Sequence, residues 1–133
     1  MINIIEEFGR NAGRIWEILC SQGPQTEKKL MSTTGLKAHE FYAAVGWLAR
    51  ENKVSKIDMT YQLGDTNMTD QIGQNAGKIF TMLETMKEMD VTEIPDLTRI
   101  KPMDAYSALG WLARENKIEA MMPMPKEYQI KFK

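Results

Sequence analysis

The sequence predicts an α+β fold that is mainly helical, in which a unit of three helices and a β-hairpin occurs twice. Three observations lead to this prediction. Two long segments recur at a constant distance, apolar residues follow a helical spacing in three parts of each copy, and the third part is followed by the alternation that is typical of strands. The chain of 133 residues is long enough for two small domains.

The repeat has an offset of 64 residues. GRNAGRIWEIL (9–19) matches GQNAGKIFTML (73–83), and YAAVGWLARENKV (42–54) matches YSALGWLARENKI (106–118). Over 9–54 against 73–118, 18 of 46 residues are identical without a gap, and the identity is continuous over GWLARENK. We therefore expect two domains, at 1–64 and 68–133. The turn-rich linker between them is so short that the units must be neighbours.

The first helix of each unit is indicated by apolar residues at i, i+4, i+7 and i+11. In the first copy these are Phe8, Ala12, Ile15 and Leu19, and Gly23-Pro24 ends the segment. The second copy repeats the spacing with Ile72, Ala76, Ile79 and Leu83.

The second and third helices follow in the same way. Residues 26–31 form a short helix that Gly35 terminates, whereas the second copy uses 90–97 and has Arg99 in place of Gly35, so we expect a differently built turn there. The third helix covers 37–51 and is capped by a left-handed Asn52. Its buried stripes are Phe41, Val45 and Leu48 in the first copy, and Ala105, Leu109 and Leu112 in the second.

Each third helix is followed by a predicted hairpin. Residues 54–59 alternate as a strand does and 60–63 can return beside them, while the second copy uses 118–122 and 128–132 with a tip three residues longer. Three helices followed by a hairpin, with a tight turn between helices two and three, make a winged helix-turn-helix. A unit of about 65 residues is close to the lower limit for independent stability, so burial against its twin should help.

The GxNAGxIW segment, together with the later Y-x-A-x-GWLARENK, resembles a small winged helix-turn-helix family of bacteria and archaea whose function is uncharacterised. The resemblance covers nearly the whole chain, twice. It implies the winged-helix fold and, by analogy of fold, a DNA-binding or transcriptional role, although the same fold also serves in protein interactions.

If the units read double-stranded DNA, the third helix should enter the major groove. Its outward face then carries His39, Ala43, Gly46 and Arg50 in the first copy and Met103, Ser107, Gly110 and Arg114 in the second. Side chains that hold phosphates or read bases are mostly Lys, Arg and polar residues. The residues expected to bind nucleic acid are therefore Lys37, His39, Arg50, Lys53, Lys56, Lys101, Arg114 and Lys117.

The same helices also carry features of a packing surface. Glycine destabilises a helix by roughly 0.5–1 kcal/mol relative to alanine, yet two glycines recur in the third helices and two more precede an aromatic residue in each first helix. Close approach of another backbone is the usual reason. The residues expected in a contact between repeats, or with a partner, are Gly9, Gly13, Trp16, Ala43, Gly46, Trp47, Gly73, Gly77, Phe80, Ser107, Gly110 and Trp111.

Composition narrows the function classes. Cys20 and His39 are the only residues of their types and lie in different helices, so we expect no disulfide, metal site, cofactor or catalytic nucleophile, and no enzyme. The N-terminus lacks an apolar stretch long enough for a signal peptide or membrane span, which predicts a cytoplasmic protein. The net charge of −1 lacks the basic excess of a typical DNA-binding protein.

Two function classes remain. The first is a tandem winged-helix factor that binds DNA and is related to transcription. The second is a protein-interaction module, in which the apolar outer face of the third helix contacts a protein partner or a second copy of the chain. The repeats form a built-in pair in either case. The burial of Trp47 and Trp111 should discriminate between these classes, because mutual burial would withdraw the third helices from DNA.

Overall fold

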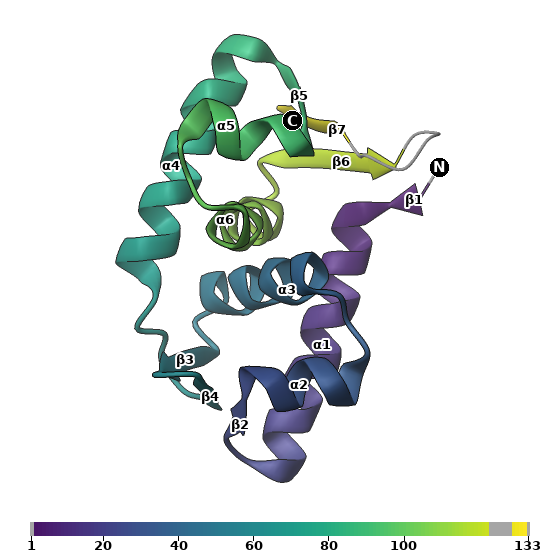
Figure 1. Cartoon of the computed structure of the whole chain (residues 1–133), viewed down its shortest axis with the longest axis vertical. Helices are drawn as coiled ribbons and strands as arrows, with labels where there is room; N and C mark the ends of the chain where they lie inside the picture. Colours follow the sequence, from purple (N-terminus) through teal and green to yellow (C-terminus); the bar gives the residue numbers. More distant parts are fainter. Residues whose placement is uncertain (1, 123–128, 133) are drawn as a thin grey trace.

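The computed structural model describes residues 2–122 and 129–132 (Figure 1). The elements of the first repeat are β1 (Ile2–Asn3), α1 (Ile4–Gln22), β2 (Gln25–Thr26), α2 (Glu27–Thr34), α3 (Ala38–Arg50), β3 (Val54–Ile57) and β4 (Thr60–Leu63). Those of the second repeat are α4 (Thr69–Met86), β5 (Glu88–Asp90), a 3-10 turn η1 (Val91–Glu93), α5 (Ile94–Thr98), α6 (Pro102–Arg114), β6 (Ile118–Met122) and β7 (Gln129–Phe132). The predicted fold of two winged helix-turn-helix units is confirmed.

Capping residues set the ends of the helices in the first repeat. The side chain of Asn3 accepts hydrogen bonds from the first free backbone N–H groups of α1, and Thr26 does the same for α2. Gly23 ends α1 and Gly35 ends α2, with φ of 77° and 72°. Glycine adopts positive φ with less strain than residues that carry a side chain. The terminators that the sequence predicts are therefore confirmed.

The third helices end alike. Asn52 and Asn116 follow α3 and α6 with φ of 60° and 61°, as the sequence predicts, because asparagine tolerates the left-handed conformation better than most residues. The prediction of a different turn after the second helix of repeat two is wrong. Arg99 adopts φ of 62° and caps α5 in the same left-handed conformation as Gly35, so the turn is kept at the cost of placing a side chain there.

The two wings lie in separate antiparallel sheets. The first sheet has the strand order β2-β4-β3, with Lys56 opposite Tyr61. The second has the order β1-β6-β7-β5, so the first strand of the chain pairs with the wing of the second repeat. The sequence did not predict the short strands β1, β2 and β5. The longer tip predicted for the second hairpin falls on 123–128, outside the described residues.

Each hydrophobic core contains residues from both repeats. Ile4 and Phe8, at the start of α1, are buried in the core that α4, α5 and α6 form. Met68 and Ile72, the residues 64 positions later at the start of the second repeat, are buried in the core of α1, α2 and α3. The beginnings of the two repeats are thus exchanged, and neither sequence repeat encloses a complete core on its own.

Candidate nucleic-acid interface

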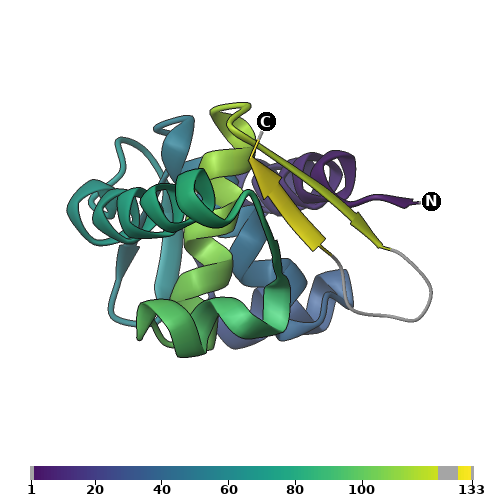
Figure 2. The ribbon, with the colours of Figure 1, turned by 90° about the horizontal axis from the view of Figure 1, so that it is seen from above.

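The two third helices, for which the sequence predicts either DNA reading or a packing contact, pack against each other along their length. In Figure 2, seen from above, α6 covers much of α3, and the turns that follow the two helices lie side by side. Contacts run in step from one end to the other: the rings of His39 and Tyr106 are 5.4 Å apart near the N-terminal ends, and Arg50 pairs with Glu115 at the C-terminal ends. The helices therefore run in the same direction.

The contact is closest at the recurring glycines of these helices. A Cβ atom on Gly46 would lie 1.8 Å from the carbonyl oxygen of Ser107, and one on Gly110 would lie 1.8 Å from the carbonyl oxygen of Ala43. No real side chain is accommodated at such a distance, so backbone meets backbone. Ala43 and Ser107 are 0% and 8% exposed. The face expected to enter the major groove is occupied by the other repeat.

The two tryptophans of the repeated motif are half-buried beside this contact. Gly9 leaves room for Trp47, whose ring a Cβ on Gly9 would approach to 3.0 Å, and Gly73 does the same for Trp111 at 3.5 Å. Each indole is covered by an arginine of the other repeat. The guanidinium of Arg114 lies 5.9 Å from the Trp47 ring centroid, in the range of a cation–π interaction.

Reciprocal ion pairs close the same end of the helices. Arg50 Nε lies 3.1 Å from Glu115 Oε2, and Arg114 Nε lies 3.0 Å from Glu51 Oε2. Each glutamate also pairs with a lysine of its own repeat, at 3.5 Å for Lys53 and 3.4 Å for Lys117. We call this group the clasp; it consists of Trp47, Arg50, Glu51, Lys53, Trp111, Arg114, Glu115 and Lys117.

The glycine contact, the clasp and the helix end together account for most of the residues that are identical in GWLARENK. In a contact between two copies of one surface, each interaction occurs twice, with a residue of either copy against the same partner type in the other. Glycine permits the backbone approach, tryptophan and arginine stack across the contact, arginine and glutamate pair across it, and asparagine ends the helix. Four cations and two glutamates leave the clasp with an excess of two positive charges.

Other residues expected in an interface are placed differently. Trp16 is 39% exposed and lies 5.5 Å beneath the ammonium of Lys53, and Phe80 has the same relation to Lys117 at 5.1 Å. A Cβ on Gly13 or on Gly77 would meet nothing within 4 Å. The glycine stripe of the first helices is thus in contact only at its first members, which face the indoles.

Comparison with known families agrees with this architecture. The model of the winged helix-turn-helix domain family DUF2582 matches residues 4–62 and, a second time, residues 67–128. The chain belongs to this family. No curated protein and no solved structure matches the chain. This chain is thus a tandem of two DUF2582 domains with the winged-helix architecture. Winged helices generally serve DNA binding or regulation, and proteins of this fold are typically not enzymes.

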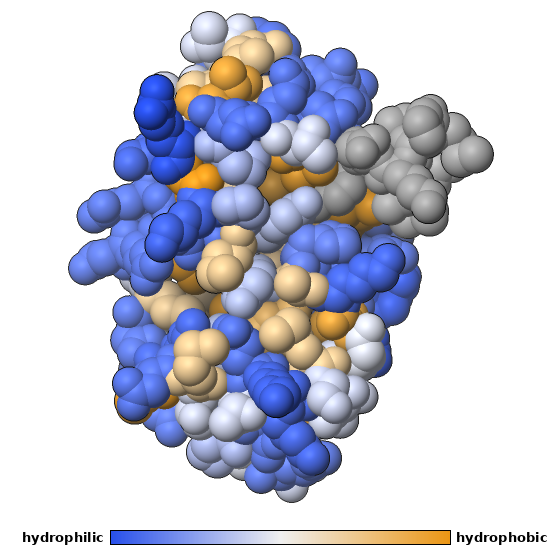
Figure 3. Space-filling view, in the orientation of Figure 1, coloured by the Kyte–Doolittle hydropathy of each residue, from blue (hydrophilic) through white to orange (hydrophobic). Residues whose placement is uncertain are grey.

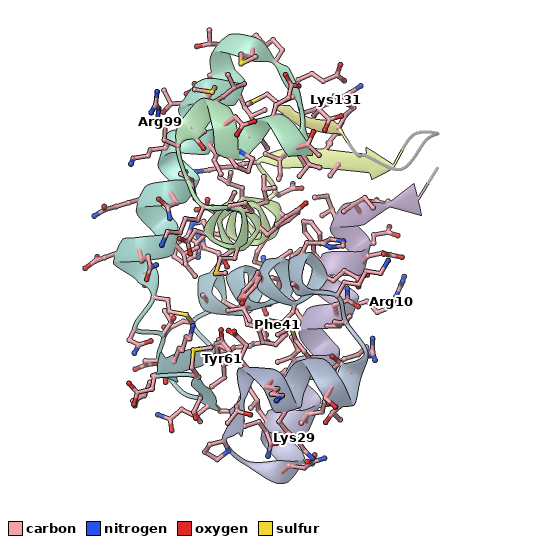
Figure 4. All side chains as sticks on the ribbon, in the orientation of Figure 1. Arg10, Lys29, Phe41, Tyr61, Arg99 and Lys131 are labelled. Carbon is pink, nitrogen blue, oxygen red and sulfur yellow. The ribbon has the colours of Figure 1, made fainter. Side chains whose placement is uncertain are left out.

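The cations expected to bind nucleic acid do not form one surface in this DUF2582 tandem. Arg50, Lys53, Arg114 and Lys117 meet in the clasp. Lys37, His39 and Lys101 lie at the opposite ends of α3 and α6, roughly 20 Å away along helices of 13 residues. Figure 4 shows further cations, Arg10, Lys29, Arg99 and Lys131, at separate places on the periphery.

Lys56 belongs to a buried polar cluster that the sequence did not reveal. The carboxylate of Glu27, 6% exposed, accepts hydrogen bonds from the hydroxyls of Tyr42 (2.9 Å) and Tyr61 (2.7 Å) and lies 3.6 Å from the Lys56 ammonium. Burial, reinforced by the bond to Glu27, raises the pKa of Tyr42 to about 12 and that of Tyr61 further. The sequence gives one indication of this cluster, because the position of Glu27 is occupied by Val91 in the second repeat.

The rest of the surface is mixed. On the face shown in Figure 3, apolar residues gather across the middle, where α3 and α6 lie, and hydrophilic residues surround them. Within 2–122 and 129–132, no group of three or more His, Cys, Asp or Glu side chains is placed to hold a metal ion. No helix in this part of the chain is long and apolar enough to cross a membrane.

Proposed function

We propose that the chain is a regulatory DNA-binding protein that holds the backbone of duplex DNA with the clasp, rather than by inserting its third helices into the major groove. The observation that carries this proposal is the cluster of Arg50, Lys53, Arg114 and Lys117. Their side chains are 45–46% exposed and come from equivalent positions of the two repeats. These side chains are therefore accessible to phosphate groups, although each is also paired with a glutamate.

Two further features support the proposal. The first is that the cations occur in two equivalent sets, one from each repeat. A DNA duplex presents two equivalent strands, so each set can contact one strand. The occupied outer face of α3 and α6 removes the side chains that would read base edges. Contacts of this kind position a protein on DNA without selecting a sequence. The expected activity is therefore weak, salt-sensitive binding with little sequence preference.

Fluorescence anisotropy with a labelled duplex at low salt tests the proposal. Neutralising about four phosphates should give a slope of log K against log salt near −3.6, and the variant Lys53→Ala/Lys117→Ala should lower its magnitude by about 2. These lysines are chosen because their ion pairs are within a repeat, so the contact between repeats is kept. Lys28→Ala/Lys29→Ala, on α2, is the matched control. Absence of binding by the wild type at low salt would refute the proposal.

A second candidate function is a protein-interaction module. The mutual burial of the third-helix faces favours it, because winged helices that do not read DNA can offer other surfaces to proteins. The net charge of −1 points the same way. Self-association is the form that can be tested directly, by sedimentation velocity over a wide range of concentration. A stable dimer, combined with no DNA binding at low salt, would select this function over the first.

A further inference from the structure

A cleft lies at the junction of the two repeats, away from the clasp. Its volume is about 190 Å³, and its walls come from α3, from the hairpin of β3 and β4, and from the beginnings of α4 and α6. Sites for drug-sized ligands are usually about 300–1,000 Å³, so this cleft suits a smaller molecule. Ile72 and Met103 supply apolar wall. Polar groups come from Lys56, Asp58, Asp104 and Ser107.

The cleft has unneutralised negative charge. Asp58 and Asp104 line it, and neither carboxylate has an ion-pair partner in the described ranges of the chain. Lys56 is the one cation in its lining, and the carboxylate of Glu27 already pairs with that ammonium at 3.6 Å. A ligand that enters between the two aspartates therefore meets an environment that favours positive charge.

Ser107 supplies an independent indication of a ligand. It lines the cleft and is only 8% exposed, yet its hydroxyl makes no hydrogen bond with any residue of 2–122 or 129–132. Buried polar groups are nearly always hydrogen-bonded, and an unpaired hydroxyl in such a place needs an explanation. A ligand with an N–H donor would supply the missing partner.

The equivalent place in the other half of the molecule has different residues. There the rings of His39 and Tyr106 are 5.4 Å apart and inclined by 46°, whereas Met103, the counterpart of His39, lines the cleft together with Tyr42. Glu40, the counterpart of Asp104, accepts a hydrogen bond of 2.9 Å from the backbone of Lys37. Asp104 makes no such bond. The cleft is thus lined by residues that the other side of the pair does not repeat.

We propose that this cleft binds a small organic cation, a primary amine or a guanidinium, carried on a short aliphatic chain. Asp58 and Asp104 hold the positive group, the hydroxyl of Ser107 accepts a hydrogen bond from it, and Ile72 and Met103 cover the aliphatic part. A metal ion fits less well, because the described residues offer no cluster of three ligating side chains. Since α3 and α6 both contribute walls, the bound cation contacts both repeats.

Isothermal titration calorimetry with agmatine as the probe tests this proposal on the full chain at low ionic strength. One molecule should bind per chain, and Asp58→Asn and Asp104→Asn should each weaken binding roughly tenfold through the loss of a charge-assisted hydrogen bond. Asp96→Asn, on the exposed start of α5, is the matched control and should leave the affinity unchanged. Succinate, a small dianion, should give no heat of binding.

Amide chemical shifts of the wild-type chain provide a readout that does not depend on the variants' folding. Agmatine should move the amide signals of Asp58, Asp104 and Ser107 and leave those of Arg50 and Arg114 in place. The proposal is overturned if the wild type binds no agmatine, if Asp58→Asn/Asp104→Asn retains the wild-type affinity, or if the shifts map to the clasp. None of these results depends on DNA binding.

Discussion

In the first repeat, a buried glutamate lies between two tyrosines beneath the third helix, whereas in the second repeat a valine takes the equivalent position. The C-terminal half of the contact between the repeats shows the opposite behaviour, since GWLARENK is unchanged there. Each side of that contact packs against the equivalent residues of the other repeat. The interiors of the two repeats differ instead, since this position is charge-paired in the first repeat and apolar in the second.

The largest effect is expected at the glycines between α3 and α6. Gly46→Ala/Gly110→Ala places two Cβ atoms 1.8 Å from backbone carbonyl oxygens, which the helices can relieve only by moving apart. We expect a loss of about 5 kcal/mol in the free energy of unfolding, as for two strongly overpacked sites. Urea denaturation followed by circular dichroism measures it.

The control for this substitution is the matched pair Gly13→Ala/Gly77→Ala. These helical glycines face open space, so alanine should stabilise the chain by roughly 0.5–1 kcal/mol per site. Equal effects of the two double variants would show that the contact between the third helices contributes nothing particular to stability.

The next largest effect tests the exchange of core residues between repeats. Phe8→Ala removes a ring that is 3% exposed and belongs to the core of the second repeat, and we expect a loss of about 4 kcal/mol. Hydrogen exchange should show deprotection of β6 and β7 at least as strong as that of β3 and β4. Deprotection confined to the first repeat would contradict the exchanged arrangement.

Comparison of the sequence with the structure shows which features a single chain encodes locally. Helix spacing, Gly35 and Asn52 predicted the elements of each unit, because caps and periodicity depend on neighbours in the chain. The exchange of Ile4 and Phe8 against Met68 and Ile72 could not be predicted, since both arrangements bury the same apolar residues.

The candidate site was only partly predictable, for a similar reason. The sequence identified Gly46, Trp47 and Arg50 as unusual, and their recurrence suggested either DNA or a packing contact. The partners that decide their geometry, Ser107 and Glu115, lie in the other repeat. The role of Glu27 depends on two tyrosines from different elements, which only the tertiary fold brings together.

A medium effect on the free energy of unfolding is expected at Glu27, the buried carboxylate that only the first repeat has. Glu27→Gln removes the charge that Lys56 pairs with and replaces one acceptor by a donor, so we expect a loss of about 2 kcal/mol. Thermal unfolding measures it. Glu88→Gln, which breaks the exposed pair with Lys131, is the control and should cost less than about 0.5 kcal/mol. Equal losses would mean that burial of Glu27 has no consequence.

The same cluster predicts an alkaline dependence of stability. The pKa of Tyr42 is raised to about 12 in the folded chain, above its usual value near 10, so its contribution is complete below pH ~10 and is lost as the pH rises towards 12. Absorbance at the tyrosinate band should show Tyr42 ionising near pH 12 while the chain remains folded. Glu27→Gln should bring that ionisation to lower pH. An unchanged pKa would show that Glu27 does not influence the ionisation of Tyr42.

The smallest effect concerns the ion pairs that the repeats share. Arg50 and Glu115 are 45% and 17% exposed, so solvent screens them, and a double-mutant cycle of Arg50→Ala and Glu115→Ala should give a coupling of about 0.5–1 kcal/mol. The cycle of Arg114 and Glu51 should give the same value, because its geometry repeats at 3.0 Å. The cycle of Arg10 and Glu7, 4.0 Å apart on one exposed helix face, should give almost none. Unequal couplings in the first two cycles would contradict this expectation. They would show that the two ion pairs of the clasp differ in energy although their residues are identical.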